Sequence, residues 1–111
     1  MLPSAKRLSA EKFKVVIEKG AFFHSDFILL RLMKTQEKSR FAVSVPKRVA
    51  KTAVLRNKMR RRVYSAVGTM ESMIKPGFNV ILIMKSGAQK VSLKGLVLDI
   101  GKIFVKSGIL K

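Results

Sequence analysis

Residues 27–33 constrain the fold most, because an extended segment there is apolar on both of its faces. Alternate side chains of a strand point to opposite sides of the sheet. The two sets are Phe27, Leu29 and Met33 on one face and Ile28, Leu30 and Leu32 on the other. A strand with one face in water alternates apolar and polar residues instead. Each face of this strand therefore has to meet a helix or a ligand.

The periodicity of the remaining chain predicts three helices and three further strands. Apolar residues recur every three or four positions over residues 9–19, 54–70 and 92–108, which predicts helices. Branched and aromatic residues predict strands over residues 21–23, 41–45 and 78–84, the last after a turn at Pro76-Gly77. The order is helix, three strands, helix, strand, helix. We expect one two-layer α+β domain over residues 1–111, with a four-stranded mixed sheet.

Residues suited to helix ends support two of these helices. Ser9 and Ser92 precede the first and third predicted helices, and serine is a good N-cap. Gly20 follows the first helix, where we expect it to adopt the left-handed conformation that commonly ends a helix.

The charge of the chain restricts the class of partner. The 111 residues include 24 Lys and Arg but only 6 Asp and Glu, which gives a net charge of +18. This surplus favours a polyanion, with nucleic acid as the leading candidate. The apolar runs, such as residues 80–84, are far shorter than the ~20 residues that cross a membrane, and the first twenty residues lack the apolar core of a secretion signal. We expect a cytoplasmic protein with no membrane partner and no small-molecule substrate.

The positive charge is concentrated between Glu37 and Glu71, where the sequence has no acidic residue. The basic residues in this interval are Lys38, Arg40, Lys47, Arg48, Lys51, Arg56, Lys58, Arg60, Arg61 and Arg62. On the predicted helix, Arg56 and Arg60 are four positions apart and repel each other, and so do Lys58 and Arg62. A bound polyanion would neutralise this arrangement.

Two neutral residues share the polar face of that helix. Asn57 supplies both a donor and an acceptor in the middle of the basic face. Tyr64 lies one helical turn from Arg60 and Arg61, so that its ring can stack on an unpaired base. Tyr64 can equally cover the edge of the core, and the sequence leaves both interpretations open.

Two adjoining segments resemble the protein component of bacterial ribonuclease P. They are residues 40–48, Arg-Phe-Ala-Val-Ser-Val-Pro-Lys-Arg, and residues 53–61, Ala-Val-Leu-Arg-Asn-Lys-Met-Arg-Arg. That family has a short strand ending in Val-x-Lys-Lys, then Ala-Val-x-Arg-Asn-Arg-x-Lys-Arg on a helix. The identical positions in the second segment are Ala53, Val54, Arg56, Asn57 and Arg61. Tyr64 and Ser65 stand where the family usually has Arg followed by Glu.

The resemblance implies an accessory subunit that joins a large catalytic RNA and helps it to remove the 5′ leader from precursor tRNA. It also implies that the helix over residues 54–70 belongs to a left-handed crossover between parallel strands, a rare connection. By the same resemblance, the leader lies in a groove lined by Phe13, Ile17 and Leu30. The holoenzyme is expected to use Mg²⁺ held mainly by RNA, with no metal ligand firmly assigned in the chain. Charge and resemblance together predict these RNA-binding residues: Lys47, Arg48, Lys51, Arg56, Asn57, Lys58, Arg60, Arg61, Arg62 and Tyr64.

The sequence offers no catalytic constellation of its own. Metal-assisted cleavage by a protein needs gathered carboxylates, but the acidic residues are scattered, and only Glu11 and Glu18 share a predicted helix. A pair of histidines is excluded, because His24 is the only histidine, and we expect it in a solvated hairpin turn. We therefore expect no catalytic residue in the protein and assign the chemistry to the RNA partner.

Three other interpretations remain at this point: a structural RNA-binding protein of the ribosomal type, a DNA-compacting architectural protein and a free-standing nuclease. The leading interpretation predicts a log–log salt slope of roughly −4 to −9 for RNA binding, from about 6–10 neutralised phosphates. It also predicts that replacing Arg56, Arg60 and Arg61 by Ala weakens assembly with RNA and leaves the isolated fold intact.

Overall fold

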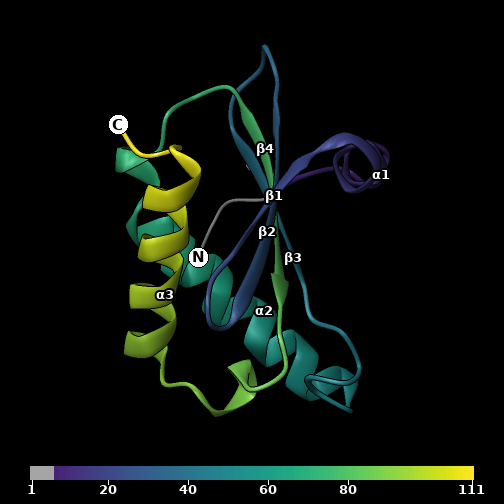
Figure 1. Ribbon diagram of the computed structural model, residues 1–111. Helices are drawn as coiled ribbons and strands as arrows, with labels where there is room; N and C mark the ends of the chain where they lie inside the picture. Colours follow the sequence, from purple (N-terminus) through teal and green to yellow (C-terminus); the bar gives the residue numbers. More distant parts are fainter. Residues whose placement is uncertain (1–6) are drawn as a thin grey trace.

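The computed structural model describes residues 7–111, in which one four-stranded sheet has helices on both of its faces (Figure 1). The strands are β1 (Ala21–His24), β2 (Ile28–Lys34), β3 (Arg40–Ser44) and β4 (Phe78–Met84). Helix α1 (Ala10–Lys19) lies against one face, and helices α2 (Ala53–Thr69) and α3 (Leu93–Ser107) lie against the other. The predicted order of elements is confirmed. The expected two layers become three, because α1 covers the second apolar face of β2.

The sheet is mixed, as predicted, and its strand order is β1-β2-β4-β3. Strand β2 pairs antiparallel with both β1 and β4, whereas β3 pairs parallel with β4. Helix α2 therefore lies in the crossover between two adjacent parallel strands, and β3 is left at the edge of the sheet. The left-handed sense of this crossover stays a prediction from the resemblance.

The main core lies between the sheet and the pair α2 and α3. Ile28, Leu30 and Leu32 of β2 project into it and meet side chains such as Val63 and Phe104 from the two helices. A smaller cluster on the opposite face contains Val16 of α1, Ala42 and Ile81. The larger cluster explains why one face of β2 is wholly apolar.

Two of the three predicted helix caps are confirmed, and the third has a different backbone conformation. The Ser9 and Ser92 hydroxyls accept hydrogen bonds from Lys12 N–H (3.4 Å) and Gly95 N–H (3.1 Å), so both predicted N-caps are confirmed. The left-handed conformation expected at Gly20 is wrong, since its φ is −71°. Glycine is needed there because a Cβ would lie 2.6 Å from the Val16 carbonyl oxygen.

A buried carboxylate fixes α3 to the turn between β1 and β2. Asp99 is 3% exposed, and its Oδ2 accepts hydrogen bonds from Ser25 Oγ (2.7 Å) and Phe27 N–H (3.2 Å). This contact holds one end of the sheet against α3. Within residues 7–111, no helix is both long and apolar enough to cross a membrane.

Candidate nucleic-acid interface

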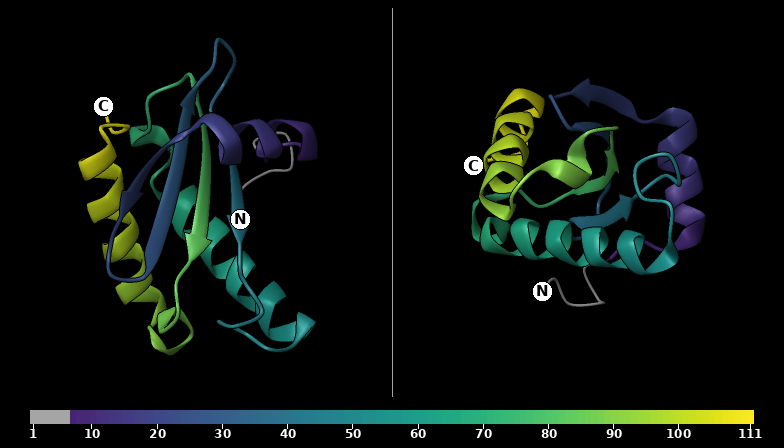
Figure 2. Two further views of the ribbon diagram at one scale, coloured as in Figure 1. Left: turned by 45° about the vertical axis from the view of Figure 1, so that its right-hand side comes forward. Right: turned by 90° about the horizontal axis from the view of Figure 1, so that it is seen from below.

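Helix α2 buries one stripe of its surface and leaves the rest facing outward. Met59, Val63, Ala66 and Val67 are buried against the sheet and α3. In the described part of the chain, no other helix or strand covers the outer side of α2 (Figure 2). Thr52 caps its first turn by accepting a hydrogen bond from Leu55 N–H (3.2 Å), and that turn contains no acidic residue. The positive end of the helix dipole is therefore not offset by an acidic side chain in the first turn.

Two hollows flank the outward ridge of α2. The first, which we name the Tyr64 hollow, has a volume of about 500 Å³ and is lined by Arg7, Val54, Asn57, Arg60, Arg61 and Tyr64. The second, the loop-side hollow, has a volume of about 510 Å³ and is lined by Arg48, Val49, Ala50, Lys51, Thr52, Leu55, Lys58, Met59, Arg62 and Gln89. Neither lining includes a carboxylate. The structure thus brings eight of the ten predicted RNA-binding residues to these two hollows, while Lys47 is exposed nearby and Arg56 lies elsewhere.

Arg56 holds the loop before α2 and does not line either hollow. Its Nη1 donates to the carbonyl oxygens of Ala50 and Lys51, both at 3.1 Å, and the side chain is half-buried. The expectation that Ala at Arg56, Arg60 and Arg61 leaves the fold intact stays a prediction, but Arg56 differs from the other two because its side chain holds part of the fold. In the helical projection, position 56 falls between Val63 and Val67 of the buried stripe, which places Arg56 on the inner side of the helix in its first turn.

Arg60 and Asn57 contact each other on the outer side of α2. The Arg60 guanidinium donates to Asn57 Oδ1 one turn earlier, and both residues line the Tyr64 hollow. A guanidinium held in this way is oriented for bidentate contact with phosphate oxygens. The two residues thus act together rather than as independent charges.

Tyr64 fastens α2 to the edge of the sheet. Its hydroxyl accepts a hydrogen bond from Val43 N–H (3.2 Å) on the edge strand β3, and the half-buried ring packs against the main core. One face of the ring is covered by the Arg7 guanidinium, whose Cζ lies 4.6 Å from the ring centroid. The structure favours the core-edge role for Tyr64, and stacking on an RNA base stays a prediction for its remaining surface.

Arg7 is a residue of this site that sequence reasoning missed. The segment that carries it is anchored to the edge strand, because Leu8 N–H donates to Phe41 O at 2.7 Å and Arg7 bridges with Phe41. Arg7 Nε is buried and has no hydrogen-bond partner within the described residues. The sequence gave no signal that Arg7 joins this site, because Arg7 is far from α2 along the chain. The pairing of its neighbour Leu8 with the sheet is what brings it there.

The predicted leader groove is only partly assembled. Phe13 is half-buried against the smaller core cluster, and Ile17 is 36% exposed on the same side of the sheet. Leu30 is 0% exposed in the main core on the opposite side, so grouping it with Phe13 and Ile17 is wrong. On the α1 side, β2 instead presents Leu29, Arg31 and Met33, in register with alternate residues of β4. The face of β2 with Ile28, Leu30 and Leu32 is buried in the main core. The face with Arg31 is more exposed to solvent.

Arg31 and Phe22 stand where Leu30 was expected. Arg31 Nη2 donates to the carbonyl oxygens of Ile17 (2.6 Å) and Gly20 (2.9 Å) at the end of α1, where a cation is favourable. Its Cζ lies 5.9 Å from the ring centroid of Phe22, which is 60% exposed. The signal available in the sequence was Arg31 itself, the one charged residue in the apolar run over residues 27–33.

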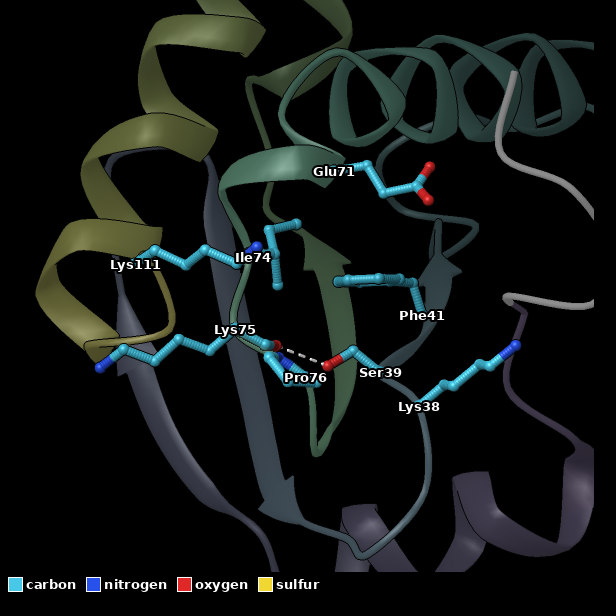
Figure 3. A pocket seen from close by; sticks show the side chains of 8 residues that line it. All are labelled: Lys38, Ser39, Phe41, Glu71, Ile74, Lys75, Pro76 and Lys111. Carbon is cyan, nitrogen blue, oxygen red and sulfur yellow. Dashed lines mark hydrogen bonds between the residues drawn. The ribbon is translucent and has the colours of Figure 1, made fainter.

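A third hollow lies near the end of α2 and differs in its charge (Figure 3). Phe41 and Ile74 form its apolar part, and the Ser39 hydroxyl donates to Lys75 O across one side at 2.8 Å. The Glu71 carboxylate lines it together with lysines, so this hollow lacks the single sign of charge found along α2. A single sign of charge is therefore found only at the two hollows of α2 among these three hollows.

Comparison with known proteins identifies the family of this chain. The family model described as Ribonuclease P matches residues 2–108. The chain belongs to the ribonuclease P protein family. The ribonuclease P protein component of Synechococcus elongatus is 33% identical over 92 residues, which cover 78% of this chain and 75% of the relative. That of Synechocystis is 26% identical over 112 residues, covering 98% and 90%.

A solved structure of another ribonuclease P protein shares the fold. The Staphylococcus aureus RNase P protein superposes with a TM-score of 0.86, covering 97% of this chain and 100% of that one at 19% identity. Together with the family match, this confirms the α+β fold and the interpretation of the chain as the protein component of an endoribonuclease. The ribonuclease P resemblance read from residues 40–61 is therefore confirmed.

Proposed function

We propose that the chain acts in a ribonuclease P ribonucleoprotein by binding the catalytic RNA through α2 and the 5′ leader of precursor tRNA on the α1 side. The observation that carries this proposal is the outward surface of α2, where two hollows are lined by basic groups and no carboxylate. Guanidinium and ammonium groups bind RNA phosphates and release condensed counterions. Placed between two RNA molecules, this surface lowers their mutual repulsion and so favours assembly.

We assign the cleavage chemistry to the RNA. Within residues 7–111, no group of three His, Cys, Asp or Glu side chains is placed to hold a metal ion. These donors do not fit a metal centre, so we assign the Mg²⁺ expected in the holoenzyme to the RNA and derive no step through a protein-bound ion. The residues of this chain position RNA and supply counter-charge. Cytoplasmic location stays a prediction from the sequence.

We place the leader beside α1 on the corrected set of residues. Ile17 and Phe22 have exposed side chains, and Arg31 contacts the Ile17 carbonyl oxygen and the Phe22 ring, so it connects α1 to β2 and β1. An aromatic ring and an aliphatic surface suit the faces of unpaired bases, and the arginine suits the phosphates between them. Phe13 contributes at the inner side of the same face, and Leu30 takes no part.

Reconstitution tests the proposal directly. The full chain is mixed with a bacterial ribonuclease P RNA and precursor tRNA at a low Mg²⁺ concentration at which the RNA alone is nearly inactive. We expect correctly placed 5′ cleavage that neither component gives alone. A chain that binds this RNA but leaves cleavage unchanged would contradict the proposal and favour a structural RNA-binding role. Cleavage by the chain without the RNA would contradict the assignment of the chemistry.

A further inference from the structure

The loop-side hollow combines an apolar floor with a basic rim. We define the floor as Val49, Ala50, Leu55 and Met59, and the rim as Arg48, Lys51, Lys58 and Arg62. Three floor residues are less than 9% exposed, but Leu55 is 49% exposed in the first turn of α2. The floor therefore presents apolar surface to solvent, and covering that surface is favourable.

The rim adds charge of a single sign around this surface. Its four cations come from both the loop before α2 and the helix itself, and the lining has no carboxylate to neutralise them. The N-terminus of α2, capped by Thr52, opens onto the same hollow and contributes positive partial charge. The hollow is thus complementary to a ligand with negative charge at its periphery and a flat apolar part at its centre.

The hollow is preformed by the backbone of the loop. Val49 N–H and Ala50 N–H both donate to Pro46 O, at 3.0 and 3.3 Å. Arg56 holds the next two carbonyl oxygens of the loop from below. A site that is already ordered loses less conformational entropy when it binds.

Gln89 adds a polar group at the edge of the floor. Its Oε1 accepts a hydrogen bond from Gly87 N–H (2.9 Å), which orients the amide and leaves the Nε2 donors available. Such donors suit the acceptor atoms at the edge of a nucleobase. A simple phosphate would contact the basic rim but not the apolar floor, and an aliphatic ligand would contact the floor but neither the rim nor the Gln89 amide.

We propose that the loop-side hollow binds one unpaired nucleotide of the RNA partner, with its base on the apolar floor and its flanking phosphates on the basic rim. This inference rests on the proposed RNA-binding function and specifies the form of RNA that is recognised there. A duplex would present phosphates to the rim but leave the floor in water. A second copy of this chain, with its net charge of +18, would repel the rim.

Methyl NMR on the full chain tests the placement of the base. One sample is titrated with the adenosine trinucleotide, and another with ribose 5-phosphate, which has no base. We expect the trinucleotide to shift the Leu55 and Met59 methyl signals through the ring current of the base, and ribose 5-phosphate to leave them in place. Two further samples contain phosphatidylglycerol vesicles or a polyglutamate peptide. If either of them shifts the Leu55 and Met59 methyl signals and the trinucleotide does not, the proposal is overturned.

A pair of matched variants tests the energetic role of the floor. Leu55→Ser removes apolar surface and no charge, so we expect trinucleotide affinity to fall about three- to tenfold with the salt slope unchanged. The control is Leu98→Ser, the same change at a 61% exposed position on α3, which should stay within about twofold. Circular dichroism checks that both variants are folded.

The failure of this inference is distinguishable from failure of the proposed function. Trinucleotide binding that shifts only Arg and Lys side-chain signals would overturn the nucleotide pocket, while ribonuclease P reconstitution could still succeed. Equal affinities for the Leu55→Ser and parent chains would overturn it as well. If the chain neither binds the trinucleotide nor supports cleavage, both the inference and the proposed function are wrong.

Discussion

Tyr64 shows how one side chain joins the basic surface of α2 to the rest of the fold. No other strand of the sheet pairs with the outer side of β3 at Val43, and the Val43 N–H donates to the Tyr64 hydroxyl instead. The same ring is covered by Arg7, so the tyrosine also positions a cation at the Tyr64 hollow. A position that the ribonuclease P family usually gives to arginine is thus filled here by a ring that holds an arginine from another segment.

The first prediction concerns the Tyr64 hydroxyl. Tyr64→Phe removes the acceptor for Val43 N–H but keeps the ring under Arg7, so we expect a loss of about 0.5–1.5 kcal/mol in the free energy of unfolding. RNA affinity should change little, because no charge is removed. Urea unfolding and RNA titration measure the two quantities. Unchanged stability would show that water satisfies Val43 N–H equally well.

The second prediction separates two arginines that the sequence grouped together. Arg56→Ala should lower the free energy of unfolding by about 1–2 kcal/mol, because two loop carbonyl oxygens lose a charged donor. Arg60→Ala removes the same charge but only a contact within the exposed side of α2, so its effect should stay within about 0.5 kcal/mol. Chemical denaturation of both variants provides the comparison. Equal losses of stability would contradict the loop-holding role of Arg56.

Single residues also mark the limit of what the sequence predicts. The alternation along residues 27–33 separates Leu30 from Leu29 correctly, but it does not state which set meets α1. Arg31 decides the matter, because a face that carries a guanidinium is not the one buried in the main core. Arg7 was unpredictable for a different reason, since its contact with Tyr64 depends on how distant segments pair across the sheet.

At the scale of elements, local signals placed the helices well. Ser9 and Ser92 cap α1 and α3 as predicted, and residues 78–84 form β4 with the predicted bounds. The arrangement of layers needed tertiary information. Two apolar faces on β2 required two coverings, but only the structure shows that α1 covers one face alone while α2 and α3 share the other.

The third prediction concerns how α1 is attached to the loop between β2 and β3. The Lys12 ammonium donates to Glu37, and this hydrogen bond and its opposite charge lower the pKa of Glu37 from its ordinary value of 4.5. A carboxyl group with a lowered pKa stabilises the fold above its ordinary pKa, and this contribution disappears as the pH falls through the lowered value. The parent should therefore melt at a higher temperature than Glu37→Gln at pH 7, and the two melting temperatures should begin to converge near pH 4.5 and meet as the pH falls through the lowered pKa.

The control for this effect is a carboxylate on α1, the helix that carries Lys12. Glu18→Gln removes the same charge near the other end of α1, where the described residues provide no ion pair. Its melting difference from the parent should show no comparable convergence on acidification. Because Glu37 is exposed, salt should reduce the difference for Glu37→Gln. A difference that persists at low pH would show that the carboxylate charge is not responsible.

At the scale of the whole molecule, the distribution of charge matters more than its total. Lysines also cover α3, where Lys94 and Lys102 are exposed, so a net charge of +18 would attract RNA to several sides of the molecule. What distinguishes α2 is that its cations surround two hollows with neutral groups inside them. A surface that combines hollows with charge can bind RNA in one position, whereas charge alone binds RNA in many positions.

The fourth prediction tests this distinction with two double variants that each remove two positive charges. Arg60→Ala with Arg61→Ala should reduce the magnitude of the log–log salt slope for ribonuclease P RNA by about 1.4–1.8, from two phosphate contacts at about 0.7–0.9 each. Lys94→Ala with Lys102→Ala should leave the slope nearly unchanged, because contacts with phosphate, and not distant charge, release counterions. Fluorescence anisotropy between low and moderate salt measures both slopes. If the two pairs reduced the slope equally, RNA would be responding to the overall field of the molecule, and α2 would lose its special role.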